Sequence, residues 1–280
     1  MHFVCLCPTH GRPSLVANAL QLFLDQDLWD GDTAHFQIFD DANQIASQMQ
    51  TEIFGYPAAA SKSYGVISSH VWIPLPRKYN HMLNCHWIPM PRPNMWSTGI
   101  VRDPEVVYVV WDDDDVYLPW HLTAISAALR RNPAACWAHP GTVWSTYDDR
   151  PERRIPTHEA PRQESAAGRF HGALAIRGDT LSDLGGWPDT ELATYDQQML
   201  AKLKPLPQAD TAQGVETPSY CYRWADTGKW HCSGSIDEAG QYKRPPIQEP
   251  GRVETLTPRY DYSTQLILRW IANRQIQVNQ

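Results

Sequence analysis

The sequence predicts an α/β protein with a mostly parallel sheet flanked by helices. Short apolar segments typical of strands occur at 3–7, 36–39 and 106–111, and the first two enclose a helical pattern at 15–25. A strand–helix–strand order is typical of parallel strands that are joined by crossover helices. The 280 residues suffice for one large α/β domain or two small ones.

Local signals mark the loops of the N-terminal half. A loop with two prolines, 8–13, follows the first strand. We expect Ser14 to cap the helix over 15–25, because a serine side chain can accept a hydrogen bond from an amide that the first helical turn leaves free. The strand 36–39 ends in two adjacent aspartates, and an insert rich in proline and tryptophan occupies 55–104.

The second half of the chain continues the alternation of strands and helices. The expected elements are, in order, a helix at 120–131, strands at 136–139 and 170–177, helices at 179–184 and 195–203, and a closing amphipathic helix at 262–274.

The composition is that of an ordinary globular protein, with 42% hydrophobic and 20% charged residues. A formal net charge of −7 argues against non-specific binding of nucleic acid, although it allows a local basic groove. No segment resembles a signal peptide, and no apolar run approaches the roughly 18 residues of a membrane span. We therefore expect a soluble, cytoplasmic protein.

The most informative segment is the acidic run after the strand 106–111. It consists of Asp112, Asp113, Asp114 and Asp115. Ligands of open α/β sheets bind at the carboxyl ends of the strands. Because side chains alternate along an extended chain, we expect Asp112 and Asp114 to point the same way and to bind one hard divalent metal ion such as Mg²⁺. The alternative is a solvated acidic turn.

Further motifs occur in a fixed order around this run. They are Cys-Pro-Thr-His-Gly-Arg-Pro at 7–13, Phe-Asp-Asp at 39–41, Trp-Asp-Asp-Asp-Asp-Val-Tyr-Leu-Pro-Trp-His-Leu at 111–122, Gly-Gly-Trp-Pro at 185–188, Tyr-Asp-Gln-Gln-Met-Leu at 195–200, and Tyr-Arg-Trp to Trp-His-Cys-Ser-Gly at 222–234. Together they resemble the family 2 glycosyltransferases of the GT-A fold. The resemblance implies a Rossmann-like catalytic domain over 1–240, with the insert at 55–104, and a C-terminal extension over 241–280.

The resemblance also implies roles for single residues. In that family the aspartates after the central strand form the DxD signature, which binds Mn²⁺ or Mg²⁺ on the donor diphosphate. The metal ligands that it implies here are Asp112, Asp114, Asp115 and His231. The residues that it implies for binding the donor are Pro8, Thr9, Arg12, Asp40, Asp41, Lys78, Asp112, Asp113 and Arg223. For Lys78 the alternative is a solvated loop charge, whereas the planar guanidinium of Arg223 suits a diphosphate.

The most specific predicted roles are those of Asp196 and His231. Asp196 matches the second acid of the family's catalytic pair and would take the proton of the acceptor hydroxyl. Tyr195 stands where the family has the first acid, and a helix N-terminal acid is the alternative for Asp196. His231 would complete the metal shell, where an imidazole suits Mn²⁺ better than Mg²⁺. A structural histidine is the alternative.

The implied reaction is a metal-dependent transfer of a sugar, with inversion, from a nucleoside-diphosphate sugar, with UDP as the expected nucleotide. The acceptor could be an envelope glycan or lipid, or a 5-hydroxymethylpyrimidine in DNA. A sugar-nucleotide nucleotidyltransferase is an alternative, but it would need a glycine-rich loop where the first loop has only Gly11. A non-catalytic module that binds sugar nucleotides is another, because Tyr195 replaces one acid.

Overall fold

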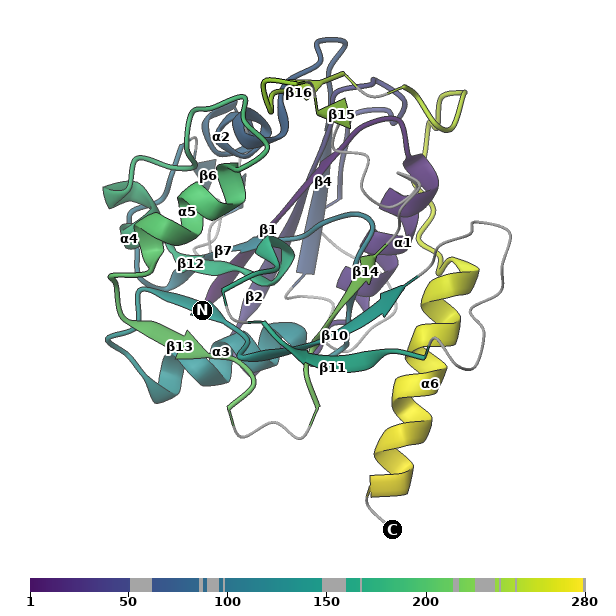
Figure 1. The fold of residues 1–280 in the computed structure, drawn as a ribbon. Coiled ribbons are helices and arrows are strands. Elements are labelled where there is room, and N and C mark those ends of the chain that lie inside the picture. The colour runs from purple at the N-terminus through teal and green to yellow at the C-terminus, as the bar shows by residue number, and fades with distance from the viewer. Residues whose placement is uncertain are drawn as a thin grey trace.

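A mixed sheet of eight strands forms the centre of the computed structural model (Figure 1). Its four central strands run parallel to one another and are, in spatial order, β7 (Val106–Val110), β1 (His2–Thr9), β2 (Thr33–Asp40) and β4 (Lys62–Ser68). Four shorter strands complete its edges, namely β3 (Gln48–Gln50) beside β4, then β12 (Ala175–Arg177), β9 (Trp137–His139) and β13 (Gln208–Asp210) beside β7. Only β3 and β12 run against the common direction. The predicted α/β fold class is confirmed.

The structure describes residues 1–50, 62–85, 88–89, 96–97, 99–147, 160–166, 168–213, 217–224, 235–236, 238–244 and 246–278. Parts of the insert at 55–104 and the segment around His231 lie outside these residues.

Helices cover both faces of the sheet (Figure 1). Those of one face are α1 (Pro13–Leu24), α3 (His121–Arg131) and α6 (Tyr262–Val278), whose apolar side chains share one buried cluster. Those of the other face are α2 (Leu75–Cys85), α4 (Gly178–Asp183) and α5 (Tyr195–Leu203), which share a second cluster. Among the described helices, none has the length and hydropathy to cross a membrane.

Strand β1 separates the two cores. Phe3, Cys5 and Cys7 point into the first cluster, whereas Val4 and Leu6 point into the second. All five side chains are buried, as expected for the central strand of a parallel sheet. The two cysteines therefore serve packing, in agreement with the apolar environment that raises the pKa of the Cys5 thiol.

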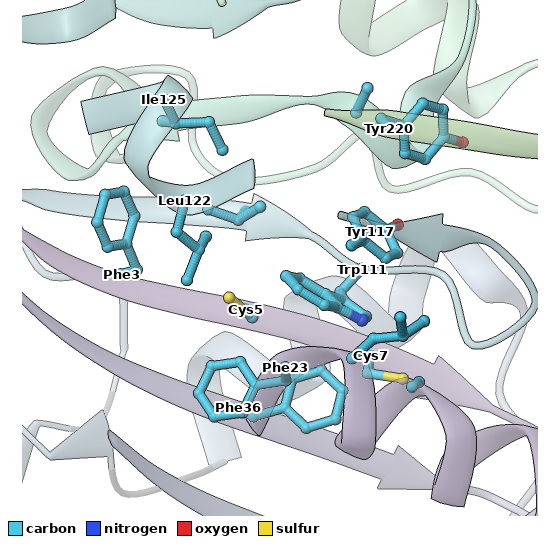
Figure 2. Packing of buried hydrophobic residues seen from close by; sticks show 14 of the residues in the cluster. Phe3, Cys5, Cys7, Phe23, Phe36, Trp111, Tyr117, Leu122, Ile125 and Tyr220 are labelled. Carbon is cyan, nitrogen blue, oxygen red and sulfur yellow. The ribbon is translucent and has the colours of Figure 1, made fainter. Parts of the chain in front are cut away.

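Aromatic rings fill the first cluster beneath the carboxyl end of the sheet (Figure 2). Phe23 stacks on Phe36 with ring centroids 4.9 Å apart, and Trp111 meets Phe36 edge-on at 5.6 Å. The indole of Trp111 stacks in turn on Tyr117 at 3.9 Å. This rigid stack holds both ends of the acidic run, because Trp111 precedes Asp112 and Tyr117 follows Asp115 closely.

A smaller sheet of four strands adjoins the acidic run. Its strands are, in spatial order, β11 (Arg162–Ser165), β10 (Thr142–Tyr147), β14 (Tyr220–Trp224) and β8 (Val116–Tyr117). Two short antiparallel strand pairs complete the described strands, β5 (Ile88–Pro89) with β6 (Trp96–Ser97) and β15 (Ser235–Ile236) with β16 (Tyr242–Lys243).

The prediction that Ser14 caps the first helix is wrong. The helix begins two residues earlier than predicted, at Pro13, whose fixed φ suits the first helical position, and Arg12 occupies the cap position without a side-chain cap. Instead, Glu249 accepts hydrogen bonds from the Ser14 amide, at 2.9 Å, and from the Ser14 hydroxyl. A carboxylate from the C-terminal segment thus takes over the capping of α1.

The C-terminal segment lies along the loops that follow β1 and β2. The amide of Glu249 donates to the Gly11 carbonyl at 3.0 Å, and the amide of Val253 donates to the Gln44 carbonyl at 2.6 Å. Helix α6 then packs Ile267 into the first cluster. A domain boundary at residue 240 stays a prediction.

Candidate active site

The acidic run forms a turn between β7 and β8. The chain leaves the main sheet after Val110, so the strand alternation that would point Asp112 and Asp114 the same way does not apply. Asp113 and Asp114 face the loop after β1, whereas Asp112 and Asp115 lie against Gly172 of the 3-10 turn η3 (His171–Ala173).

Arg12 joins the loop after β1 to the acidic run. Its guanidinium donates to Asp113 at 2.5 Å and to Asp114 at 3.1 Å, and the Thr9 hydroxyl donates to the other oxygen of Asp113 at 2.6 Å. Arg12 and both aspartates are buried. Two segments about a hundred residues apart are thus held together by charge-assisted hydrogen bonds.

Gly172 lies in close contact with the other two aspartates. A Cβ atom at this glycine would lie 2.6 Å from Oδ2 of Asp112, 2.7 Å from the Tyr220 hydroxyl and 3.0 Å from Oδ2 of Asp115. The Tyr117 hydroxyl fixes the spacing, because it accepts from the Asp112 amide at 2.7 Å and donates to the Gly172 carbonyl at 3.0 Å. Only glycine fits at this position.

Burial and mutual repulsion make it unfavourable for all four aspartates of the run to be ionised at once. Burial, together with the charges of Asp114 and Asp113, raises the pKa of Asp112 to about 8. Burial, together with the charges of Asp114 and Asp112, raises the pKa of Asp115 well above its ordinary value. Tyr220 donates to Asp115, and Tyr79 donates to Asp112 at 3.4 Å.

These carboxylates have the chemistry of a site for a hard divalent cation. Carboxylate oxygens are the ligands that Mg²⁺ and Mn²⁺ prefer. Such an ion would favour the ionised forms of Asp112 and Asp115, whose pKa values are raised by burial and by the neighbouring carboxylates. Within the described residues, however, no three His, Cys, Asp or Glu side chains already surround a common point. In this structure one oxygen of Asp114 pairs with the Arg12 guanidinium at 3.1 Å.

A pocket of about 320 Å³ opens above the acidic run. Its walls come from the end of β1 and the loop after it, from Leu75 of α2, from the run itself, from the segments around η3 and the start of α5, and from Tyr222 of β14. The lining residues on which the site depends are Pro8, Arg12, Asp112, Asp113, Asp114, Asp115, Phe170, His171, Gly172, Tyr195, Asp196 and Tyr222.

Asp196 lies on the wall of this pocket, in the first turn of α5. Its carboxylate is partly exposed and accepts from the Gln197 amide at 2.7 Å. This geometry suits a general base and also a helix N-terminal acid. The nearby Glu191 does not line the pocket, and its carboxylate pairs with the exposed Arg77 at 2.8 Å.

Several residues predicted to bind the donor are buried away from the pocket wall: Thr9, Asp40, Asp41, Lys78 and Arg223. Asp40 accepts from the amides of the loop that follows it. Lys78 pairs with Asp41 at 3.0 Å and donates to the Thr9 carbonyl at 3.0 Å. Lys78 is therefore not a solvated loop charge. His231 lies outside the described residues, so its role as a metal ligand stays a prediction.

The segment 168–172 is the part of the site that the motifs did not indicate. Phe170 adopts a left-handed backbone conformation, with φ of 65°, which is costly for a bulky residue and often marks functional sites. The turn directs His171 and Gly172 toward the acidic run. The sequence feature that could have indicated this segment is the pair Phe170 and His171 between two glycines, Gly168 and Gly172.

No family model matches this sequence, and no curated protein matches it. Solved structures do match. S. aureus TarS 1-349 in complex with UDP-GlcNAc superposes with a TM-score of 0.50 and 14% identity, over 84% of this chain and 62% of that chain. The same protein in complex with UDP gives a TM-score of 0.50 and 12% identity, over 80% and 61%. This chain thus spans about three fifths of the TarS chains that it matches. At these identities the likeness concerns the fold.

Proposed function

We propose that this protein is a metal-dependent glycosyltransferase that moves a sugar from a nucleoside-diphosphate sugar to an acceptor hydroxyl. The observation that carries the proposal is a shared pocket. Four aspartates at the carboxyl end of the central strand β7 line it together with a separate carboxylate, Asp196. A cluster of hard oxygens for a cation and a partly exposed base are the two groups that this reaction requires.

The residues that would hold Mn²⁺ or Mg²⁺ are Asp112, Asp114 and Asp115, with His231 as a fourth candidate. A bound ion would stabilise the charge that develops on the leaving nucleoside diphosphate. The raised pKa of Asp112, which is caused by burial and by the neighbouring carboxylates, supports this assignment, because a bound cation would favour the ionised form. Arg12, on the same wall, would share its N–H groups between Asp113, Asp114 and the phosphate oxygens of the donor.

Asp196 would act as the base. Its carboxylate would take the proton of the acceptor hydroxyl while that oxygen attacks the anomeric carbon from the face opposite the diphosphate, so the configuration at that carbon inverts. The position of Asp196 on the pocket wall and its partial exposure support this role.

The likeness in fold to TarS, whose structures hold UDP and UDP-GlcNAc, supports a UDP-sugar as donor. The acceptor would be a glycan or lipid of a cell envelope, or a 5-hydroxymethylpyrimidine in DNA. All of these present a hydroxyl to the base.

A two-stage experiment tests the proposal. UDP-glucose, UDP-galactose, UDP-GlcNAc and GDP-mannose are first screened for Mn²⁺-dependent thermal stabilisation. The stabilising donor is then incubated with glycan, lipid and hydroxymethylated DNA acceptors, and products are identified by mass spectrometry. We expect one acceptor to gain the mass of a sugar residue. Transfer of a nucleotidyl group, or binding without any transfer, would contradict the proposal.

A further inference from the structure

A hydrogen bond in the wall of the pocket fixes the protonation of His171. The indole N–H of Trp187 donates to Nε2 of His171 at 3.1 Å. An indole nitrogen can only donate, so Nε2 must be the unprotonated nitrogen of the ring. Burial lowers the pKa of His171 to about 3, so the ring is neutral near pH 7. A neutral ring that accepts at Nε2 carries its proton on Nδ1.

This Nδ1–H group has no hydrogen-bond partner among the described residues, although His171 is only 7% exposed. A buried donor without an acceptor is costly, and in native proteins it calls for an explanation. The ring itself is well held, because it meets Tyr79 edge-on at 5.5 Å and Tyr195 edge-on at 5.1 Å. The donor is therefore held in place before any ligand arrives.

The position of His171 indicates what it would bind. His171 lines the pocket, and the next residue, Gly172, abuts Asp112 and Asp115. On its other side the ring touches Tyr195, which precedes Asp196. In the proposed reaction the transferred sugar must lie between the diphosphate and the incoming hydroxyl, which is the space between these two groups of carboxylates.

We propose that Nδ1–H of His171 donates a hydrogen bond to an uncharged oxygen of the transferred sugar, a hydroxyl or an amide carbonyl. This inference rests on the proposed function and adds a residue that recognises the sugar. Trp187 is then a positioning residue, which keeps the proton on Nδ1. Because Asp112 and Asp115 lie beside the turn, an anionic sugar such as a uronate is disfavoured there.

Three substitutions separate the two nitrogens of the ring. His171→Asn keeps a donor near Nδ1 and loses the acceptor for Trp187. His171→Gln keeps an acceptor near Nε2 and loses the Nδ1–H group. His171→Phe loses both and preserves much of the ring packing. Dissociation constants for UDP and for the nucleotide sugar that stabilises the wild type most are measured by calorimetry with Mn²⁺ on each variant.

We expect His171→Gln and His171→Phe to weaken binding of the nucleotide sugar by about tenfold while UDP binds as before, and His171→Asn to lose about threefold or less. Wild-type affinity of the Gln variant, or an equal loss for UDP, would overturn the inference.

Nitrogen NMR of the wild-type ring gives an independent test that needs no folded variant. We expect the proton on Nδ1, and a changed Nδ1 signal when the nucleotide sugar binds but not when UDP binds. A proton on Nε2, or no response to the sugar, would overturn the inference. If the wild type binds UDP but binds no nucleotide sugar more tightly than UDP, His171 does not contact the sugar. If it binds neither, the proposed function itself fails.

Discussion

Arg223 and Asp261 form an ion pair of 3.0 Å that connects the acidic run to the segment before α6. The side chain of Arg223 is fully buried, and its Nε donates to the carbonyl of Asp114 while its amide donates to the Asp115 carboxylate at 3.1 Å. In this structure the guanidinium holds the backbone of the acidic run. A clamp on the donor diphosphate, the role that the sequence indicated, stays a prediction.

The pair predicts a stability effect of Asp261. Asp261→Asn removes the charge that faces a buried guanidinium, so we expect the free energy of unfolding to fall by about 1–2 kcal/mol. Urea denaturation at pH 7 measures it. Asp30→Asn, at an exposed position, is the control and should change stability by less than about 0.5 kcal/mol.

The pH dependence of the same variant provides a check. Burial acts to raise the pKa of Asp261, but the Arg223 charge and hydrogen bonds hold it below its ordinary value. A depressed carboxyl pKa gives stability that is present above about pH 4 and is lost as the pH falls further. The wild type should therefore lose more stability than Asp261→Asn on acidification. Parallel pH profiles of the two proteins would contradict the ion-pair account.

Gly172→Ala tests the packing of the turn against the acidic run. The added Cβ would meet Asp112 and Tyr220 at 2.6 and 2.7 Å, so the carboxylates must shift. We expect a loss of about 1–3 kcal/mol of stability and of most Mn²⁺-dependent UDP binding. Thermal melts and calorimetry measure the two effects.

Gly65→Ala is the matched control, because a Cβ there meets its nearest atom at an ordinary 3.6 Å. It should bind UDP as the wild type does. Normal binding by Gly172→Ala would show that the turn does not position the carboxylates.

Asp196→Asn separates a base from a helix N-terminal acid. Asparagine is nearly isosteric, so the fold and donor affinity should be retained, whereas transfer should fall by about 10²–10⁴-fold if the proton acceptor is lost. Steady-state rates with the identified acceptor measure this. Glu191→Gln, which changes a carboxylate outside the pocket, should keep near-normal rates. Near-wild-type transfer by Asp196→Asn would show that Asp196 serves only as a helix N-terminal acid.

The sequence predicted what depends on local pattern. The buried strand 106–110, the helix that starts at His121 and the helix that starts at Tyr195 follow from apolar periodicity and from breaks at polar residues. The acidic run indicates a site because four carboxylates after a buried strand are costly without a compensating group.

Contacts between distant segments could not be predicted in this way. Glu249 caps α1 from more than 230 residues away, so no local signal excluded Ser14 as its cap. The approach of Gly172 to Asp112 follows from the antiparallel pairing of β12 with β7, which reverses the chain direction in the sheet. That pairing brings His171 into the site, and no periodicity in the sequence indicates it.

Calorimetric titration of UDP into the wild type and into Asp114→Asn, each with Mn²⁺ and with a chelator, tests the central claim most directly. Asp30→Asn is the control. We predict that wild type and control bind UDP at least tenfold more tightly with Mn²⁺ than with chelator, and that Asp114→Asn loses this difference while keeping its melting temperature within a few degrees. Equal UDP affinity with and without Mn²⁺ in the wild type, or an undiminished Mn²⁺ effect in Asp114→Asn, would contradict the account.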